Sequence, residues 1–250
     1  MAEPTYRPSL PVRAVLLDAF GTIIHPEPGW ESLRDHCLEI VHGTWTGRAI
    51  PFRTWLACYE QARAEQHAAV QDGLREFDFA ARFTRSMRLC GMPETEAEAW
   101  GLVAHERYHQ FQQGLIHPYD TPRPTLERLK AEGYKLALVS NYAHTGVLRD
   151  ALKRLEILDP FDALVVSADV GYLKPHARIF EAALEALQVR KEEAVMVGND
   201  PLCDVVGAKH AGLRAVWTPY PRASPPPPNP LADAVLERLA ELPDVLRKLA

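Results

Sequence analysis

Long apolar runs are absent from this sequence. No stretch approaches the roughly 18 to 20 consecutive apolar residues that a membrane-spanning helix needs. Residues 1–11 are polar and contain proline, so they do not show the apolar centre of a secretory signal. We therefore predict no membrane association and a cytoplasmic location.

Cysteine is scarce, and basic residues are not in excess. The four cysteines, Cys37, Cys58, Cys90 and Cys203, form no Cys-x-x-Cys pair, so they are expected to be reduced thiols rather than a disulfide framework. A formal net charge of −5 provides no basic field for nucleic acid or an anionic membrane. The ten histidines are scattered and show no zinc-ligand spacing. We therefore expect neither nucleic acid nor a membrane surface as a partner.

The pattern of apolar residues along the chain indicates an α/β protein. Hydrophobic residues make up 47% of the chain, enough for one large core and a smaller module. Near-continuous apolar runs predict parallel strands covered on both faces at 12–18, 134–141, 163–167, 194–199 and 214–218. Helical patterns at 124–132, 145–155 and 176–188 alternate with these runs, and a last strand and helix are expected within 232–250. This alternation predicts a doubly wound parallel sheet.

A different pattern fills residues 29–115. Apolar residues recur at helical spacing over 30–41, 52–71, 77–90 and 94–113, with glycine and proline between these segments. We expect a helical cap over 26–115, inserted into a core formed by 1–25 and 116–250. An insert at that point would overhang the strand ends as a lid that excludes water. The alternative is a helical domain that only adds core.

Polar residues follow four of the predicted strands. Ligands of open α/β sheets bind just beyond the carboxyl ends of the strands, so these residues are expected to converge. A carboxylate nucleophile needs a cation nearby, and hydroxyl and amide groups can hold substrate oxygens. A second acidic cluster suits Mg²⁺, which needs only one or two carboxylates. The residues concerned are Asp18 with Gly21 and Thr22, Ser140 with Asn141, Lys174, and Asn199 and Asp200 with Asp204.

In this order, the four segments resemble the haloacid dehalogenase-like hydrolase superfamily. The resemblance covers about residues 12–218 and rests on Leu-Leu-Asp18-Ala-Phe-Gly-Thr22, Leu-Val-Ser140-Asn141, Lys174-Pro-His-Ala-Arg-Ile-Phe180 and Val-Gly198-Asn-Asp-Pro-Leu-Cys-Asp204-Val-Val-Gly-Ala. It implies a Rossmann-like core with a helical cap and a covalent intermediate on Asp18.

The resemblance also assigns roles to the other residues. Ser140 and Lys174 would stabilise the bound anion. Substrate contacts would come from Gly21, Thr22 and Asn141. In the phosphatases of the family, Mg²⁺ would be held by Asp18, the backbone carbonyl of Phe20, and the fourth motif with Asn199, Asp200 and Asp204.

Two residues depart from the phosphatase pattern. Phe20 stands where these enzymes carry the aspartate that protonates the leaving alcohol, a contribution worth about 10²–10⁴-fold. Asn199 stands where an aspartate usually opens the fourth motif, and its amide adds no negative charge. We therefore expect a phosphatase-type hydrolase of small phosphorylated metabolites that prefers good leaving groups, such as aryl or acyl phosphates.

Two alternatives stay open. A metal-independent 2-haloacid dehalogenase also lacks the second aspartate, because halide leaves without a proton. However, such enzymes usually carry tyrosine where this chain has Phe180, and serine with asparagine in the fourth motif. The other alternative is a non-catalytic relative that binds a metabolite, suggested by the losses at Phe20 and Asn199. The oligomeric state is not predicted.

Overall fold

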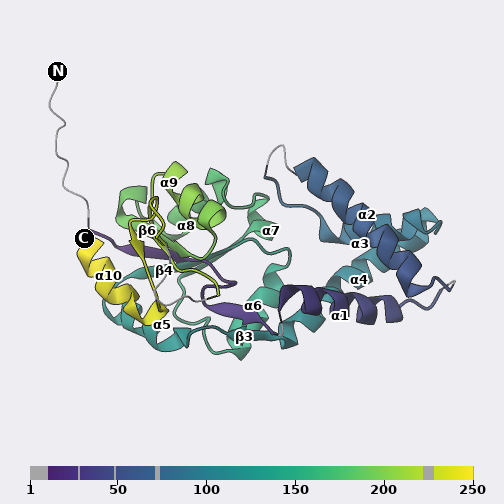
Figure 1. Ribbon diagram of the computed structural model, residues 1–250, viewed down its shortest axis with the longest axis horizontal. Coiled ribbons are helices and arrows are strands. Elements are labelled where there is room, and N and C mark those ends of the chain that lie inside the picture. The colour runs from purple at the N-terminus through teal and green to yellow at the C-terminus, as the bar shows by residue number, and fades with distance from the viewer. Residues whose placement is uncertain (1–10, 28, 48, 71–73, 222–227, 250) are drawn as a thin grey trace, which may run out of the picture.

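The chain folds into two adjoining lobes, a sheet with flanking helices and a bundle of helices (Figure 1). The computed structural model describes residues 11–27, 29–47, 49–70, 74–221 and 228–249, so residues 1–10, used above to predict location, lie outside the described part. No helix of the described residues has an apolar stretch long enough to cross a bilayer.

The first lobe is built on a six-stranded parallel sheet. Its order is β5-β4-β1-β6-β7-β8, with β1 between β4 and β6. The strands are β1 (Ala14–Leu17), β4 (Lys135–Ser140), β5 (Ala163–Val166), β6 (Ala194–Gly198), β7 (Arg214–Trp217) and β8 (Ala234–Val235). The predicted doubly wound α/β fold is confirmed, and each strand is slightly shorter than its apolar run.

Both faces of this sheet are covered. Val15 and Leu17 of β1 face one hydrophobic cluster, whereas Ala14 and Leu16 face the other. The first face is packed by α5 (Pro122–Ala131), α6 (Thr145–Arg154) and α10 (Leu242–Leu249), and the second by α8 (Ala177–Leu187) and α9 (Gly207–His210). In Figure 1, α5 and α10 lie on one side of β4 and β6, and α8 and α9 on the other. Burial on both faces explains why the strands read as continuous apolar runs.

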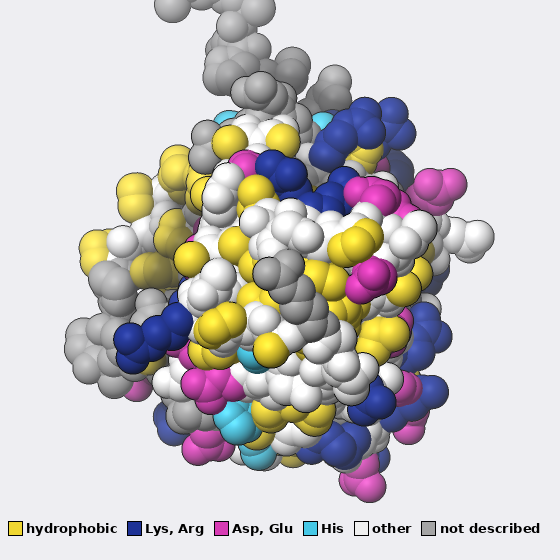
Figure 2. Space-filling model, turned by 90° about the vertical axis from the view of Figure 1, so that its right-hand side faces the viewer, with side chains coloured by type: hydrophobic (Ala, Val, Ile, Leu, Met, Phe, Trp, Pro, Cys, Tyr) yellow, Lys and Arg dark blue, Asp and Glu magenta, His cyan; other side chains and the backbone are white. Residues whose placement is uncertain are grey.

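The second lobe contains four helices around a core of its own. They are α1 (Trp30–Gly43), α2 (Phe52–Val70), α3 (Phe79–Leu89) and α4 (Glu94–Gly114), and we call them the cap. Trp55 and Phe83 stack at its centre with ring centroids 6.4 Å apart. Helix α3 begins two residues later than predicted because the Asp78 carboxylate accepts a hydrogen bond from the Ala81 amide and caps it. Viewed from its outer end, the cap carries charges of both signs, intermixed (Figure 2).

Short elements that the sequence did not predict join the lobes and shape the loops. The strands β2 (Ile24–Pro26) and β3 (Ile116–Pro118) pair antiparallel where the chain enters and leaves the cap. Each has three residues and ends in proline, so neither shows a strand pattern. The remaining elements are α7 (Ser167–Val170), a π-helical segment η2 (Pro201–Val206) and two 3₁₀ turns, η1 (Lys191–Glu193) and η3 (Leu239–Glu241).

Candidate active site

The predicted site residues converge at the carboxyl ends of the central strands. A cavity of about 170 Å³, here called the core cavity, opens at this edge of the sheet. Its lining residues come from all four motifs: Asp18, Phe20, Ser140, Asn141, Lys174, Asn199, Asp200, Cys203 and Asp204.

A buried ion triad forms the floor of the core cavity. The Lys174 Nζ donates to Asp18 Oδ1 at 2.6 Å, to Asp204 Oδ1 at 2.7 Å and to the Val139 carbonyl at 2.9 Å. The exposed fractions of Asp18, Lys174 and Asp204 are 7%, 3% and 1%. The two carboxylates hold the pKa of Lys174 above its ordinary value, although burial alone would lower it. The lysine is therefore a fixed cation beside Asp18.

Burial raises the pKa of Asp18 to about 6, against the lowering effect of Lys174. The side chain is still mainly ionised at neutral pH, which is the form that a nucleophile needs. With both carboxylates ionised, the triad carries one net negative charge. An anionic substrate would therefore need additional positive charge or hydrogen-bond donors at this site.

Asp204 contacts Lys174 through one carboxylate oxygen, Oδ1. Its second oxygen, Oδ2, accepts a hydrogen bond from the Asp200 backbone amide at 2.9 Å, so both carboxylate oxygens are engaged. These contacts pair Asp204 with Lys174, and its ligation of a metal stays a prediction. Asp200 is exposed, and its Oδ1 caps η2 by accepting from the Leu202 and Cys203 amides.

Ser140 and Thr22 provide two buried hydroxyl groups at the site. The Ser140 hydroxyl is buried, lines the core cavity and has no hydrogen-bond partner in the described part of the chain, so it is available to a ligand oxygen. The buried Thr22 hydroxyl donates to Asp18 Oδ2 at 3.3 Å. Thr22 therefore contacts the nucleophile, and its predicted contact with substrate stays a prediction.

Gly21 and Asn141 determine the backbone conformation at the site. Gly21 has a φ of 81° and donates its amide to the Ile24 carbonyl, so this amide is not free for substrate. A Cβ here would meet the Asn199 amide at 2.8 Å, which only glycine avoids. Asn141 bonds the Lys174 backbone on both sides, accepting from its amide at 2.7 Å and donating to its carbonyl at 3.0 Å. It thereby fixes the loop that presents Lys174.

Asn199 lies beside the oxygens that would bind a metal. The Asn199 side chain satisfies its hydrogen-bonding groups when its amide nitrogen faces these oxygens. In this orientation it donates to the Phe20 carbonyl at 2.8 Å and to Asp18 Oδ2 at 3.1 Å. Among the described residues, no group of three His, Cys, Asp or Glu side chains is arranged to hold a metal. However, a half-turn of this amide would present its oxygen, giving a carboxylate, a carbonyl and an amide oxygen. Mg²⁺ accepts such a set when waters complete its coordination.

Phe20 and Cys203 complete the lining without adding an acid or a base. The Phe20 ring is half-buried, with its centroid 5.2 Å from that of Tyr142. Burial, followed by the charges of Asp200 and Asp204, raises the pKa of Cys203 to about 12. This thiol is therefore protonated at neutral pH and is not a nucleophile.

A larger cavity of about 490 Å³, here called the cap cavity, lies between the cap and the core loops. Asn141 lines both cavities, so they adjoin at this residue. The sequence did not reveal the cap cavity, because its walls come from distant segments. Its lining residues are Arg34, Tyr59, Arg63, His67, Glu76, Phe77, Phe79, Arg82, Tyr108, His109, Gln112, Asn141, Tyr142, Ala143 and Leu173.

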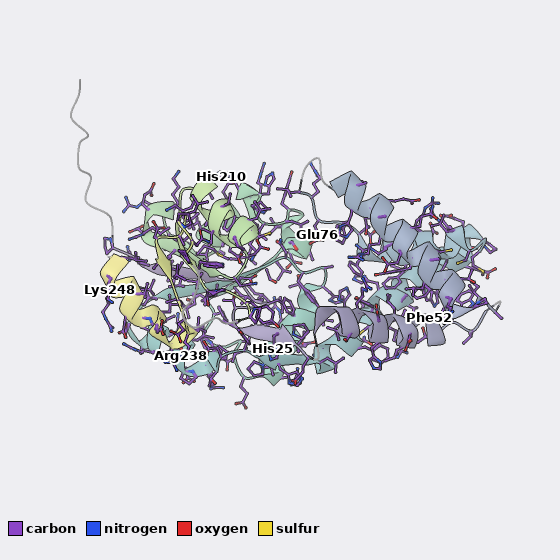
Figure 3. All side chains as sticks on the ribbon, viewed as in Figure 1. His25, Phe52, Glu76, His210, Arg238 and Lys248 are labelled. Carbon is purple, nitrogen blue, oxygen red and sulfur yellow. The ribbon has the colours of Figure 1, made fainter. Side chains whose placement is uncertain are left out.

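The segment between α2 and α3 reaches from the cap to the loop that precedes Lys174. The Leu173 amide donates to the Leu74 carbonyl at 2.8 Å, and the Glu76 amide donates to the Gly171 carbonyl at 3.0 Å. The Glu76 carboxylate also accepts a hydrogen bond from the Ser167 hydroxyl. Figure 3 shows Glu76 between the two lobes. Main-chain bonds thus connect the cap to the lysine loop.

The sequence model of the family of haloacid dehalogenase-like hydrolases matches residues 12–212, which include every residue of the triad. The chain belongs to this family. The expectation of a hydrolase of the haloacid dehalogenase-like family is thereby confirmed.

Curated relatives in this family include phosphatases. Glyceraldehyde 3-phosphate phosphatase of Pyrococcus furiosus is 34% identical over 152 residues, which cover 60% of this chain and 62% of the relative. Pyrophosphatase PpaX of Bacillus mycoides is 34% identical over 144 residues, covering 56% of this chain and 65% of the relative. The chain thus spans less than two thirds of the length of each of these two relatives.

Solved structures of the family share the architecture along nearly the whole chain. A 2-haloacid dehalogenase from Pseudomonas syringae pv. Tomato superposes with a TM-score of 0.73 at 22% identity, covering 96% of this chain and 100% of the other. A haloacid dehalogenase-like phosphatase from Thermococcus onnurineus gives a TM-score of 0.60 at 28% identity, covering 94% and 98%. The first likeness concerns the fold alone.

Proposed function

We propose that this chain is a phosphatase that hydrolyses small phosphate monoesters with good leaving groups, with Asp18 as the nucleophile. Its main support is the buried triad, which holds an ionised Asp18 carboxylate 2.6 Å from a fixed ammonium at the edge of the core cavity. The phosphatase names of its relatives support the same reaction class.

In this mechanism, a carboxylate oxygen of Asp18 bonds to phosphorus, and the bond from phosphorus to the ester oxygen breaks. The electron pair leaves on that oxygen. The positive charge of Lys174 stabilises the phosphoryl oxygens, since its three Nζ hydrogens already have acceptors. The Ser140 hydroxyl, which has no partner among the described residues, donates a hydrogen bond to them. Water then adds to phosphorus, the bond to Asp18 breaks, and inorganic phosphate leaves. The water proton passes to the departed anion or to solvent.

Phe20 gives this mechanism its substrate preference. Because its ring supplies no proton, the ester oxygen must leave as an anion, which favours phenols and acids over alkyl alcohols. When Mg²⁺ is bound, it would neutralise charge on the phosphoryl group, held by the Asp18 carboxylate, the Phe20 carbonyl and the turned Asn199 amide, with Asp200 alongside. The negative charge of the triad is a reason to expect such a cation.

The test is hydrolysis of 4-nitrophenyl phosphate and of propyl phosphate, each with Mg²⁺ and with chelator. We expect faster turnover of the aryl ester, loss of turnover with chelator, and no turnover by Asp18→Asn. The control is Asp150→Asn, which changes an exposed aspartate of α6. Full activity of Asp18→Asn would overturn the mechanism. An alkyl ester cleaved as fast as the aryl ester would overturn the leaving-group preference.

One observation favours a second candidate, a metal-independent 2-haloacid dehalogenase. Thr22, Lys174 and the Asn199 amide surround Asp18 with hydrogen-bond donors, and a carboxylate held in this way can displace halide without a metal. Halide release from 2-chloropropionate that is indifferent to chelator, without phosphate release from the aryl ester, would establish this reading. A folded protein that turns over neither substrate would indicate a binding protein.

A further inference from the structure

The cap cavity contains a buried arginine that has no carboxylate partner among the described residues. Arg82, on α3, is 4% exposed and lines the cavity. Its Nε donates to Gln66 Oε1 at 2.8 Å, and its Nη1 has a long contact of 3.5 Å with the Tyr59 hydroxyl. Its Nη2 is buried and has no hydrogen-bond partner among the residues that the structure describes. A buried cation in this state is incompletely satisfied and is suited to an anion.

Aromatic rings hold this guanidinium in place. Its central carbon lies 4.1 Å from the centroid of the Phe79 ring and 4.7 Å from that of Phe77. The faces of the rings stabilise the positive charge and fix the plane of the group, but they accept no conventional hydrogen bond. Packing therefore explains why Arg82 is held in the cap, while its Nη2 has no acceptor in the described part of the chain.

The other charged groups of the cap cavity already have partners. Arg63 pairs with Glu60 at 3.1 Å, and Arg34 pairs with Asp35 at 2.9 Å. Glu76, the carboxylate that lines this cavity, accepts from the Ser167 hydroxyl and from the Phe77 amide. Among the described residues, Arg82 is thus the arginine of this cavity that lacks a carboxylate.

We propose that Arg82 binds a second anionic group on the substrate, a carboxylate or a phosphate at the far end of the leaving group. The reacting phosphoryl group occupies the core cavity, the body of the substrate passes Asn141, and the distal anion reaches Arg82 in the cap cavity. The inference rests on the proposed phosphatase function and narrows its substrates to phosphate esters that carry a further negative charge.

The test compares two substrates with matched leaving oxygens, 4-(carboxymethyl)phenyl phosphate and its neutral analogue 4-(carbamoylmethyl)phenyl phosphate. The methylene group separates the variable group from the ring. We expect the native enzyme to prefer the carboxylate in kcat/KM by about 10- to 100-fold, the usual range for a charged hydrogen bond. In Arg82→Gln this ratio should fall to near one, mainly through KM, whereas Arg82→Lys should give an intermediate ratio.

The matched control is Arg85→Gln on the same helix. Arg85 is exposed, pairs with Glu65 at 2.9 Å and lies outside the lining of the cavity, so this variant should keep the native ratio. Thermal melting establishes that each variant is folded. A native ratio near one would overturn the inference even if Arg82→Gln failed to fold, and so would an unchanged ratio in folded Arg82→Gln.

A binding measurement separates the failure of this inference from that of the proposed function. The stable analogue 4-(carboxymethyl)benzylphosphonate should bind the native protein at least about tenfold more tightly than Arg82→Gln in calorimetry. Turnover of both esters without preference would refute the anion site and leave the phosphatase proposal intact. No turnover of either ester, with binding that depends on Arg82, would refute the phosphatase proposal and retain the anion site. Equal binding by both proteins would refute the anion site.

Discussion

Replacing Asp204 with asparagine tests the buried triad directly. The substitution conserves size and leaves an oxygen for Lys174, but it removes one of the two charges that surround the ammonium. It also turns an NH₂ group toward the Asp200 amide, which now donates to Asp204 Oδ2 at 2.9 Å. The new NH₂ group and the Asp200 amide, both hydrogen-bond donors, would then face each other at a side chain that is only 1% exposed.

Removing one partner of a buried ion pair costs about 3–5 kcal/mol. Relief of the repulsion between Asp18 and Asp204 offsets part of this cost, so we expect a loss of about 3 kcal/mol in the free energy of unfolding. For a chain of this size, that corresponds to a fall of about 6–12 °C in Tm. Because Lys174 would lose one of its anchors, we also expect a fall of about 10- to 100-fold in kcat for an aryl phosphate.

The assay is thermal melting followed by steady-state kinetics. Glu65→Gln is the control, since it breaks the exposed pair with Arg85 and should leave Tm unchanged. If Asp204→Asn melted at the same temperature as this control, the triad would not stabilise the fold. Full kcat in Asp204→Asn would show that Asp204 does not position the lysine.

Three further predictions concern the cap, the metal and the missing acid. Burial keeps the pKa of His109 well below its usual value. Below about pH 6.5 this histidine is therefore protonated in the unfolded chain but neutral in the folded chain. The free energy of unfolding then falls by up to about 1.4 kcal/mol per pH unit as the pH decreases. His109→Asn should remove this part of the slope in urea unfolding between pH 7.5 and 5.5, and equal slopes would contradict it. Asn199→Asp adds a carboxylate beside the Phe20 carbonyl and should tighten Mg²⁺ binding by about tenfold or more in calorimetry; an unchanged affinity would count against a metal at this position. Phe20→Asp restores a proton donor and should raise the rate on propyl phosphate relative to 4-nitrophenyl phosphate at least tenfold, and a constant ratio would refute the missing-acid explanation.

The sequence predicted the sheet because each strand is buried on both faces and therefore shows a continuous apolar run. It also predicted the convergence of Asp18, Ser140 and Lys174, since parallel strands deliver their carboxyl ends to one edge. It left the role of Asp204 open. An aspartate near a helix start can cap, bind metal or pair with a cation, and the choice depends on a lysine 30 residues away.

The sequence contains a signal that marks Arg82 as buried. Residues 79, 82, 83 and 86 share one face of α3 at helical spacing, and Phe79, Phe83 and Ser86 pack toward the cap interior. An arginine on such a face marks a buried charge. Periodicity could not show its surroundings, because Tyr59 and Gln66 belong to α2 and the cavity also needs the loop at Asn141.

The main-chain bonds between residues 74–76 and 171–173 act as a mechanical coupling. A displacement of the cap relative to the core would also shift the loop that presents Lys174 to Asp18. We therefore expect substitutions in the cap that alter the affinity for substrate to alter turnover as well.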